Sequence, residues 1–535
     1  MHRNPSVMVH QFAQVPQADI QRSSFDRSCG HKTTFNEGKL IPIFVDEALP
    51  GDTFNLNATM FARMATPIFP VMDNMFLESF FFSVPARLVW DNWQRFQGEQ
   101  INPGDSTDFT VPQIVAPAGG FAEGSIYDYM GLPTKVAGIS INALYLRAYN
   151  LIYNQWFRDQ NLINSITVPK TDGPDLDTLY TLQSRGKRLD YFTGCLPWPQ
   201  KGPGVSIPLG TTAPVYGKSV NSINVNDGSA NYGLGTNATG QVGLANYNTA
   251  LGSAPVGGFP ASKMIGLSPK GAESNVYADL SAATAATINS LRQAFAIQKI
   301  YERDARGGTR YVEALVARFK VKSPDARLQR PEYLGGSSTN INISPIPQTS
   351  ATATQPSPTG TLAAMGTALQ QGAGFTHSFT EHCLIIGIVQ VRADLTYQKG
   401  IERLWSRKTR FDYFEPALGH LGEQAVLQKE IYASGNASDD TVFGYQERFA
   451  EYRYKPSLIT GLFRSNAAAP LDAWHLSENF ASAPVLGPTF IQSAPPVARV
   501  VAVPSQPHFL LDAFFSLRCA RPMPLYGDPG YIDRF

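Results

Sequence analysis

The sequence predicts a mainly β protein, a Greek-key sandwich of antiparallel strands with large loop insertions and a few α-helices. Three observations lead to this prediction: segments in which apolar and polar residues alternate, the position of these segments at opposite ends of the chain, and 45 Gly and 39 Pro among 535 residues. None of the clearest strand segments has an obvious tight hairpin with a neighbour. A sheet assembled from such distant segments favours a Greek key over a meander.

Four segments show the strand pattern. Apolar residues alternate with polar residues at 54–60, 389–397 and 512–519, as expected for strands with one buried face. The fourth segment, 75–84, reads MFLESFFFSV and is apolar enough throughout for a central strand. We expect all four segments to lie in the sheets of the sandwich.

Helices are expected between these strands. The segment 141–157 places Tyr145, Tyr149, Ile152 and Trp156 on one helical face. A second helix is expected within 281–308, where the sequence closes on two glycines that are a natural helix stop. A shorter amphipathic segment, carrying Val89, Trp93 and Phe96, follows Pro85. The helices are therefore few and separate the strand segments.

Two segments have an unusual composition. Residues 203–280 are dominated by Gly, Asn, Ala, Ser and Pro and contain few charges, so they cannot supply a core of their own. We interpret them as a surface insertion that packs against copies of itself, and a disordered loop is the alternative. Residues 335–374 are rich in Ser, Thr and Pro and are predicted to form a long surface connection.

The charge balance limits the class of partner. The chain has 44 Lys and Arg against 43 Asp and Glu, a formal net charge of +1, so any contact with nucleic acid must be local. Charged residues make up only 16% of the chain, whereas about 25% is usual for soluble domains. A surface poor in charge and rich in aromatic residues suits a protein that buries much of its surface in an assembly.

Signals for membrane insertion, secretion and disulfide bonding are not found in the sequence. The N-terminal segment lacks the apolar stretch of a signal peptide, and no apolar run approaches the length of about 18 residues that a membrane helix needs. Cys29, Cys195, Cys383 and Cys519 lie far apart and form no CxxC pair. We expect no membrane insertion, and we expect the chain to fold in a reducing cytoplasm.

Motifs for enzyme chemistry mostly fail. TAPVYGKS at 212–219 ends like a phosphate-binding loop, but Thr212 replaces the first glycine that such a loop requires. His377, Glu381, His382 and Cys383 cluster in sequence, but their spacing suits neither a helical nor a strand-based metal site. We therefore predict no catalytic residue, no metal site and no cofactor.

Two basic segments with interleaved aromatic residues are the candidate site. Cations beside aromatic rings suit single-stranded DNA, because phosphates meet the charges and bases stack on the rings. Contacts between subunits, through salt bridges and cation–π packing, are the alternative. The candidate residues are Arg403, Trp405, Arg407, Lys408 and Arg410 in the first segment and Arg448, Arg453 and Lys455 in the second.

Long blocks of the sequence resemble the major capsid proteins of gokushoviruses, in the family Microviridae. The blocks include SSFDRSCGHKTTFNEGKLIPIFVDEALPGDTFNLNATMFARMATPIFPVMDN, FFFSVPARLVWDNWQRFQGE, LIIGIVQVRADLTYQKGIERLWSRKTRFDYFEP, FGYQERFAEYRYKPSLITGLFRS, LDAWHL and YGDPGYIDRF. They occur in the same order as in that family and leave out mainly 203–280, the second loose segment and short stretches between. The resemblance is therefore to the whole chain and not to one motif.

The resemblance implies an eight-stranded antiparallel jelly roll whose copies form a small icosahedral (T=1) shell around single-stranded DNA. It implies an N-terminal arm at 1–50, one jelly-roll domain at 51–535, and a three-fold protrusion at 203–280 that contacts a host receptor. It further implies assembly in the bacterial cytoplasm with a DNA pilot protein, a small basic DNA-binding protein and an internal scaffolding protein. The alternative function is a jelly-roll carbohydrate-binding protein or glycoside hydrolase, which predicts a paired acidic site in a cleft.

Overall fold

The structure is a computed structural model that describes residues 21–205, 288–321, 329–350 and 359–526, with the backbone of five short strands between 215 and 278. The chain divides into two compact units. The first unit contains Met1–Pro199 and Asp304–Phe535, and the second contains Gln200–Arg303. The second unit includes the predicted insertion at 203–280.

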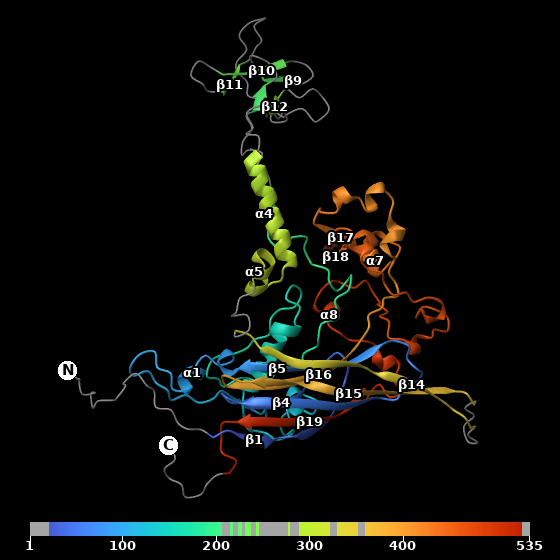
Figure 1. Cartoon of the computed structure of the whole chain (residues 1–535). Coiled ribbons are helices and arrows are strands. Elements are labelled where there is room, and N and C mark those ends of the chain that lie inside the picture. The colour runs from blue at the N-terminus through green and yellow to red at the C-terminus, as the bar shows by residue number, and fades with distance from the viewer. Residues whose placement is uncertain are drawn as a thin grey trace, which may run out of the picture. The chain divides into compact units, whose positions relative to one another are not determined.

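The two largest sheets of the first unit are antiparallel, and Figure 1 shows their strands stacked as layers. The six-stranded sheet has the order β1-β19-β4-β15-β14, and β2 also pairs with β19. Its strands are β1 (Ser23–Asp26), β2 (Cys29–Phe35), β4 (Thr53–Met64), β14 (Asn342–Pro347), β15 (Leu362–Ser378) and β19 (Phe509–Arg521). The four-stranded sheet has the order β13-β5-β16-β3. Its strands are β3 (Ile41–Ala48), β5 (Met75–Pro85), β13 (Glu332–Asn340) and β16 (Cys383–Ala393).

This topology confirms the prediction of a mainly β, antiparallel fold assembled from distant segments. The pairing of β19 with β4 joins the two ends of the chain over a long register, from Phe509 opposite Met64 to Ala520 opposite Thr53. The two sheets contain six and four strands, so their count exceeds the eight strands that the family resemblance implies.

The main core lies between the two sheets. In β4 and β19 every second residue is buried, which is the burial pattern of strands with one face in solvent. In β5 and β16 almost every residue is buried, because a second apolar cluster covers the other face of the four-stranded sheet. The uninterrupted apolar run of β5 therefore reflects a strand covered on both faces.

The second apolar cluster includes the expected helix at 141–157. It forms α3 (Leu144–Ile152) and continues as a π-helical turn, η2 (Tyr153–Phe157). Arg147 on α3 is fully buried and pairs with the buried Asp175. The short segment after Pro85 contains only one helical turn, α1 (Trp93–Phe96).

The prediction of a surface connection at 335–374 is wrong. This stretch contributes β13, β14 and most of β15 to the two sheets, and only residues 351–358 lie outside the described part. The small residues that suggested a loop allow close approach of backbones. A Cβ on Gly374 would lie 2.0 Å from the carbonyl oxygen of Leu56, and a Cβ on Gly336 would lie 2.0 Å from that of Ser79.

The predicted N-terminal arm at 1–50 is also wrong over much of its length. Residues Ser23–Asp26 and Cys29–Phe35 pair with β19, and Ile41–Ala48 pair with β16. The sandwich therefore begins near residue 23. Residues 1–20 and the terminal residues 527–535 lie outside the described part of the chain.

The second unit contains two small sheets and most of the long helix α4 (Ile288–Arg306), which confirms the helix predicted within 281–308. One sheet has the order β11-β10-β9 and the other pairs β12 with β8. The strands are β8 (Val215–Gly217), β9 (Ile223–Asn226), β10 (Asn231–Thr236), β11 (Val242–Ala245) and β12 (Val276–Ala278). The other residues of 206–287, including most of the 212–219 motif, lie outside the described part.

Among the described residues, no helix is long and apolar enough to cross a membrane. The same described residues contain no group of three or more His, Cys, Asp or Glu side chains that could hold a metal ion. Of the sequence cluster at 377–383, His377 lies 3.9 Å from Glu332, while the His382 ring packs edge-on against Trp93.

Candidate functional site

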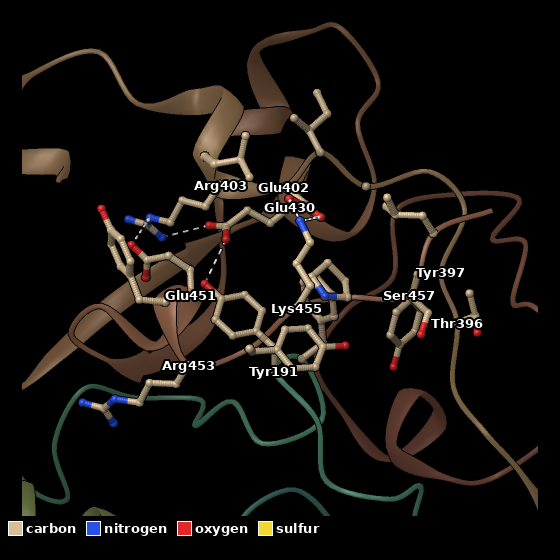
Figure 2. A pocket seen from close by; sticks show the side chains of 18 of the residues that line it. Tyr191, Thr396, Tyr397, Glu402, Arg403, Glu430, Glu451, Arg453, Lys455 and Ser457 are labelled. Atoms are coloured by element: carbon tan, nitrogen blue, oxygen red, sulfur yellow. Dashed lines mark hydrogen bonds and ion pairs between the residues drawn. The ribbon is translucent and has the colours of Figure 1, made fainter. Parts of the chain in front are cut away.

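The structure brings the two predicted basic segments together around one cavity of about 450 Å³ in the first unit, shown in Figure 2. The first segment contains η4 (Arg403–Ser406) and η5 (Arg410–Asp412), and the second contains η8 (Ala450–Tyr452). Between them in sequence, β17 (Glu423–Leu427) and β18 (Val442–Glu447) form a hairpin-like pair, with α7 (Gln428–Ile431) after β17. Because β17 pairs with β18, the second basic segment lies beside the first.

Arg403 is held inside the cavity by a buried carboxylate. It donates to Glu430 Oε1 at 2.9 Å and to the carbonyl oxygen of Ala425 at 2.8 Å. Glu430 also accepts from the Tyr191 hydroxyl at 2.9 Å and from the backbone N–H of Leu427 at 2.9 Å. Figure 2 shows Arg403, Glu430 and Tyr191 linked in this order.

Burial has opposite consequences for the two charged partners. Burial raises the pKa of Glu430, and the attraction of Arg403 only partly offsets that rise. Burial alone would lower the pKa of Arg403, but the attraction of Glu430 and of neighbouring groups raises it overall. The pair is therefore held by mutual attraction inside the fold. Arg403 therefore takes part in hydrogen bonds within the fold, to Glu430 and Ala425.

Three further candidate cations also face carboxylates of the same chain. Arg407 lies 3.8 Å from Glu451 and stacks 4.3 Å over the ring of Tyr452. Lys455 donates to both oxygens of Glu402 at 2.9 Å. These internal pairs favour a structural role for the cations involved. Arg453 pairs with Glu447 and points away from the centre of the cavity in Figure 2.

The other four candidates differ in exposure. Trp405 is 78% exposed. Lys408 and Arg410 are exposed and form no ion pair with any described residue. Arg448 donates to the carbonyl oxygen of Phe411 at 3.2 Å and stacks on Phe449. Lys408, Arg410 and Trp405 are thus the candidates that remain available to an external partner.

Exposed aromatic rings surround these available groups. We call this set the aromatic surface, and it consists of Trp405, Phe411, Tyr413, Phe414 and Tyr452. Each of its rings is at least 49% exposed. Rings of this size next to unpaired cations are suited to base stacking, and equally to a subunit contact.

Sequence reasoning missed the acidic half of this site. Glu402, Glu430 and Glu451 neutralise several of the predicted cations, and Tyr191 comes from a segment more than two hundred residues away along the chain. Only the pairing of β17 with β18 places these acids beside the cations. The sequence contained no pattern that could have identified them.

Comparison with known proteins identifies the family. Residues 13–531 match the family model described as "Capsid protein (F protein)". The chain belongs to this capsid protein family. It is 51% identical over 532 residues to "Capsid protein VP1" of Bdellovibrio phage phiMH2K, with 98% of each chain covered. It is 46% identical to "Capsid protein VP1" of Chlamydia phage 1, with 98% of each chain covered.

A third relative is the "Capsid protein VP1" of Spiroplasma virus 4, at 37% identity with 98% of this chain and 97% of the relative covered. These relatives confirm the resemblance to Microviridae of the gokushovirus type. They give no support to the carbohydrate-binding or glycoside hydrolase alternative. This capsid protein is a structural component of the virion.

Proposed function

We propose that copies of this capsid protein assemble into the icosahedral shell of a small single-stranded-DNA bacteriophage and enclose its genome. The observation that carries the proposal is the family match over 13–531, because it spans both sheets and the inserted unit. The proposed role is structural and involves no catalysis.

The outer face of the six-stranded sheet supports self-association. Phe61 and Leu369 lie opposite each other on β4 and β15, and both are about half exposed, at 47% and 54%. Phe514 and Leu510 on the neighbouring β19 are exposed to a similar degree. Large apolar side chains gathered on one sheet face are typical of surfaces that become buried on association.

Negative-stain electron microscopy of the full-length protein, expressed with its viral neighbours, tests the shell. Uniform small icosahedral particles are the expected result, because identical copies must close through repeated contacts. A monodisperse monomer under all conditions, together with binding to glycans, would contradict the proposal and favour the carbohydrate-binding alternative.

The aromatic surface is proposed to contact the packaged single-stranded DNA. We expect the double variant Lys408→Gln, Arg410→Gln to assemble but to package less DNA. Its affinity for an oligothymidylate should depend less on salt, with a slope lower by about 1.4, because each lost phosphate contact on a single strand removes about 0.7. The measurements are nuclease-protected DNA per particle and binding titrations at several salt concentrations.

The control is Lys32→Gln, because Lys32 on β2 is 78% exposed but pairs with Asp512 of the same chain at 3.1 Å. This variant should retain the DNA content and the salt dependence of the parent protein. Unchanged DNA content in the double variant, combined with weakened particles, would instead assign Lys408 and Arg410 to contacts between subunits.

Further partners are proposed on the basis of the family resemblance. The inserted unit, including 203–280, is proposed to form protrusions at the three-fold axes and to contact a receptor on the host surface. A DNA pilot protein, a small basic DNA-binding protein and an internal scaffolding protein are proposed to join during assembly in the bacterial cytoplasm. The proposal includes no membrane insertion.

A further inference from the structure

A second pocket in the first unit, with a volume of about 640 Å³, is unusually rich in cations. It lies beside β5 and β16 and is closed by residues of η2 and of the segment 185–193. Its charged lining residues are Arg158, Arg185, Lys187, Arg188 and Arg392 against Glu78 and Asp159. Five cations therefore face two carboxylates in one concave site.

Part of this positive charge is neutralised within the fold. Glu78 is shared between Arg185 and Arg392, and its Oε1 accepts from Arg392 Nε at 2.6 Å. Lys187 pairs with Glu478 at 2.6 Å. These three cations have carboxylate partners, so they form the wall of the pocket but contribute little unsatisfied charge.

Arg158 and Arg188 are not neutralised in this way. Neither forms an ion pair with a described residue, and Arg188 is exposed. Arg158 donates to the carbonyl oxygen of Ile163 at 2.6 Å, but its Nε is buried and has no hydrogen-bond partner. Burial, followed by repulsion from Arg310, lowers the pKa of Arg158. An anion that entered the pocket would relieve both effects.

The second carboxylate of the lining does not satisfy Arg158. Asp159 Oδ1 instead accepts from the backbone N–H groups of Asn161 at 2.9 Å and Leu162 at 3.0 Å, in a local turn. The lining of the pocket therefore contains two arginines, Arg158 and Arg188, that have no carboxylate partner among the described residues. Guanidinium groups match the oxygen geometry of phosphate particularly well.

The size and the walls of the pocket argue for more than a simple ion. A volume of about 640 Å³ is in the range of small-molecule sites. Trp156, Phe157, Leu395 and Ile491 provide apolar lining beside the cations. We propose that this pocket binds the phosphate group of a nucleotide through Arg158 and Arg188, with the nucleoside against the apolar lining.

The nucleotide could come from two sources, free nucleotide or a strand of DNA. Only the strand source rests on the proposed genome contact, whereas binding of a free nucleotide does not require a shell. The experiment is isothermal titration of the full-length protein with inorganic phosphate, with thymidine monophosphate and with an eight-residue oligothymidylate. The three probes separate recognition of phosphate, nucleoside and strand.

We expect thymidine monophosphate to bind saturably and more tightly than inorganic phosphate. Arg158→Gln and Arg188→Gln should each weaken that binding about 10-fold, as expected for loss of one charge-assisted hydrogen bond. Arg518→Gln, an exposed arginine on β19 in the other sheet, is the matched control and should leave the affinity unchanged. Because Arg188 is exposed, its replacement tests the pocket without disturbing the fold.

Tighter binding of the oligothymidylate than of the mononucleotide, lost in Arg188→Gln, would support the strand source. Equal binding of both probes would support the free nucleotide. Absence of binding by phosphate and thymidine monophosphate would overturn the proposal, as would binding that both variants retain. The proposal would also be overturned if Arg188→Gln failed to assemble into particles and the parent protein bound no phosphate. That result would indicate that a carboxylate of a second copy of the chain occupies the pocket.

Discussion

Replacement of Asp175 by alanine is expected to destabilise the folded protein by about 3–5 kcal/mol, because it leaves a buried guanidinium without its carboxylate partner. Arg147 and Asp175 have side chains that are 0% and 2% exposed. Two hydrogen bonds join them, from Arg147 Nε at 2.7 Å and from Nη2 at 2.6 Å. The Tyr180 hydroxyl also donates to Asp175, so the substitution removes the acceptor of three donors.

The midpoint of urea unfolding of the full-length chain measures this effect. The control is Glu123→Ala, which removes an ion pair of the same 2.6 Å length to Lys135 at the surface, where the side chains are 67% and 69% exposed. An exposed pair contributes about 0–1 kcal/mol, so the control should barely change the midpoint. Equal shifts for the two variants would contradict the assignment of Arg147 as a buried charge that depends on Asp175.

Replacement of Phe81 by alanine is expected to cost about 3–5 kcal/mol of stability, because the cavity left by a buried phenyl ring cannot fully collapse. Phe81 is 0% exposed and lies at the centre of the sandwich. Its ring centroid is 6.3 Å from that of Phe44, 5.7 Å from Phe375 and 6.4 Å from Phe515. These rings come from both sheets, so the substitution weakens the contact between the layers.

Phe61→Ala is the matched control for this substitution. Phe61 also lies in a strand, but its side chain is 47% exposed on the outer face of the six-stranded sheet. We expect less than about 1 kcal/mol of lost stability for the isolated chain. We also expect impaired particle assembly, because the same face is proposed to be an interface. Similar unfolding midpoints for Phe61→Ala and Phe81→Ala would contradict the two-sheet core described above.

The strand pattern was predictable because each pattern depends on neighbouring residues alone. Alternation at 54–60 and 512–519 identified β4 and β19, since a strand with one face in solvent needs an apolar residue at every second position. The run at 75–84 identified β5, and the long helix within 281–308 was found from its apolar face. Family membership was also predictable from the sequence, because long blocks of residues resemble the family and occur in the same order.

The sequence did not predict the strands β13 to β15 or the strands before residue 50. Small and polar residues dominate Gly335–Gly374, and the local composition is that of a loop. These residues form strands because their backbones pair with β5 and β4, and at Gly336 and Gly374 the approach is too close for a side chain. Such a requirement exists only between segments that the fold brings together.

In the candidate site, too, some features were predictable from the sequence and others depend on contacts made in the fold. The recurrence of cations and aromatic rings in two segments, 403–410 and 448–455, is visible in the sequence. Which of these side chains are available to a partner depends on the folded arrangement. Arg403 forms an ion pair with the buried Glu430, while Trp405 remains exposed. The physical reason is that neutralisation of a charge depends on groups within a few ångströms in space, and sequence distance does not specify that proximity.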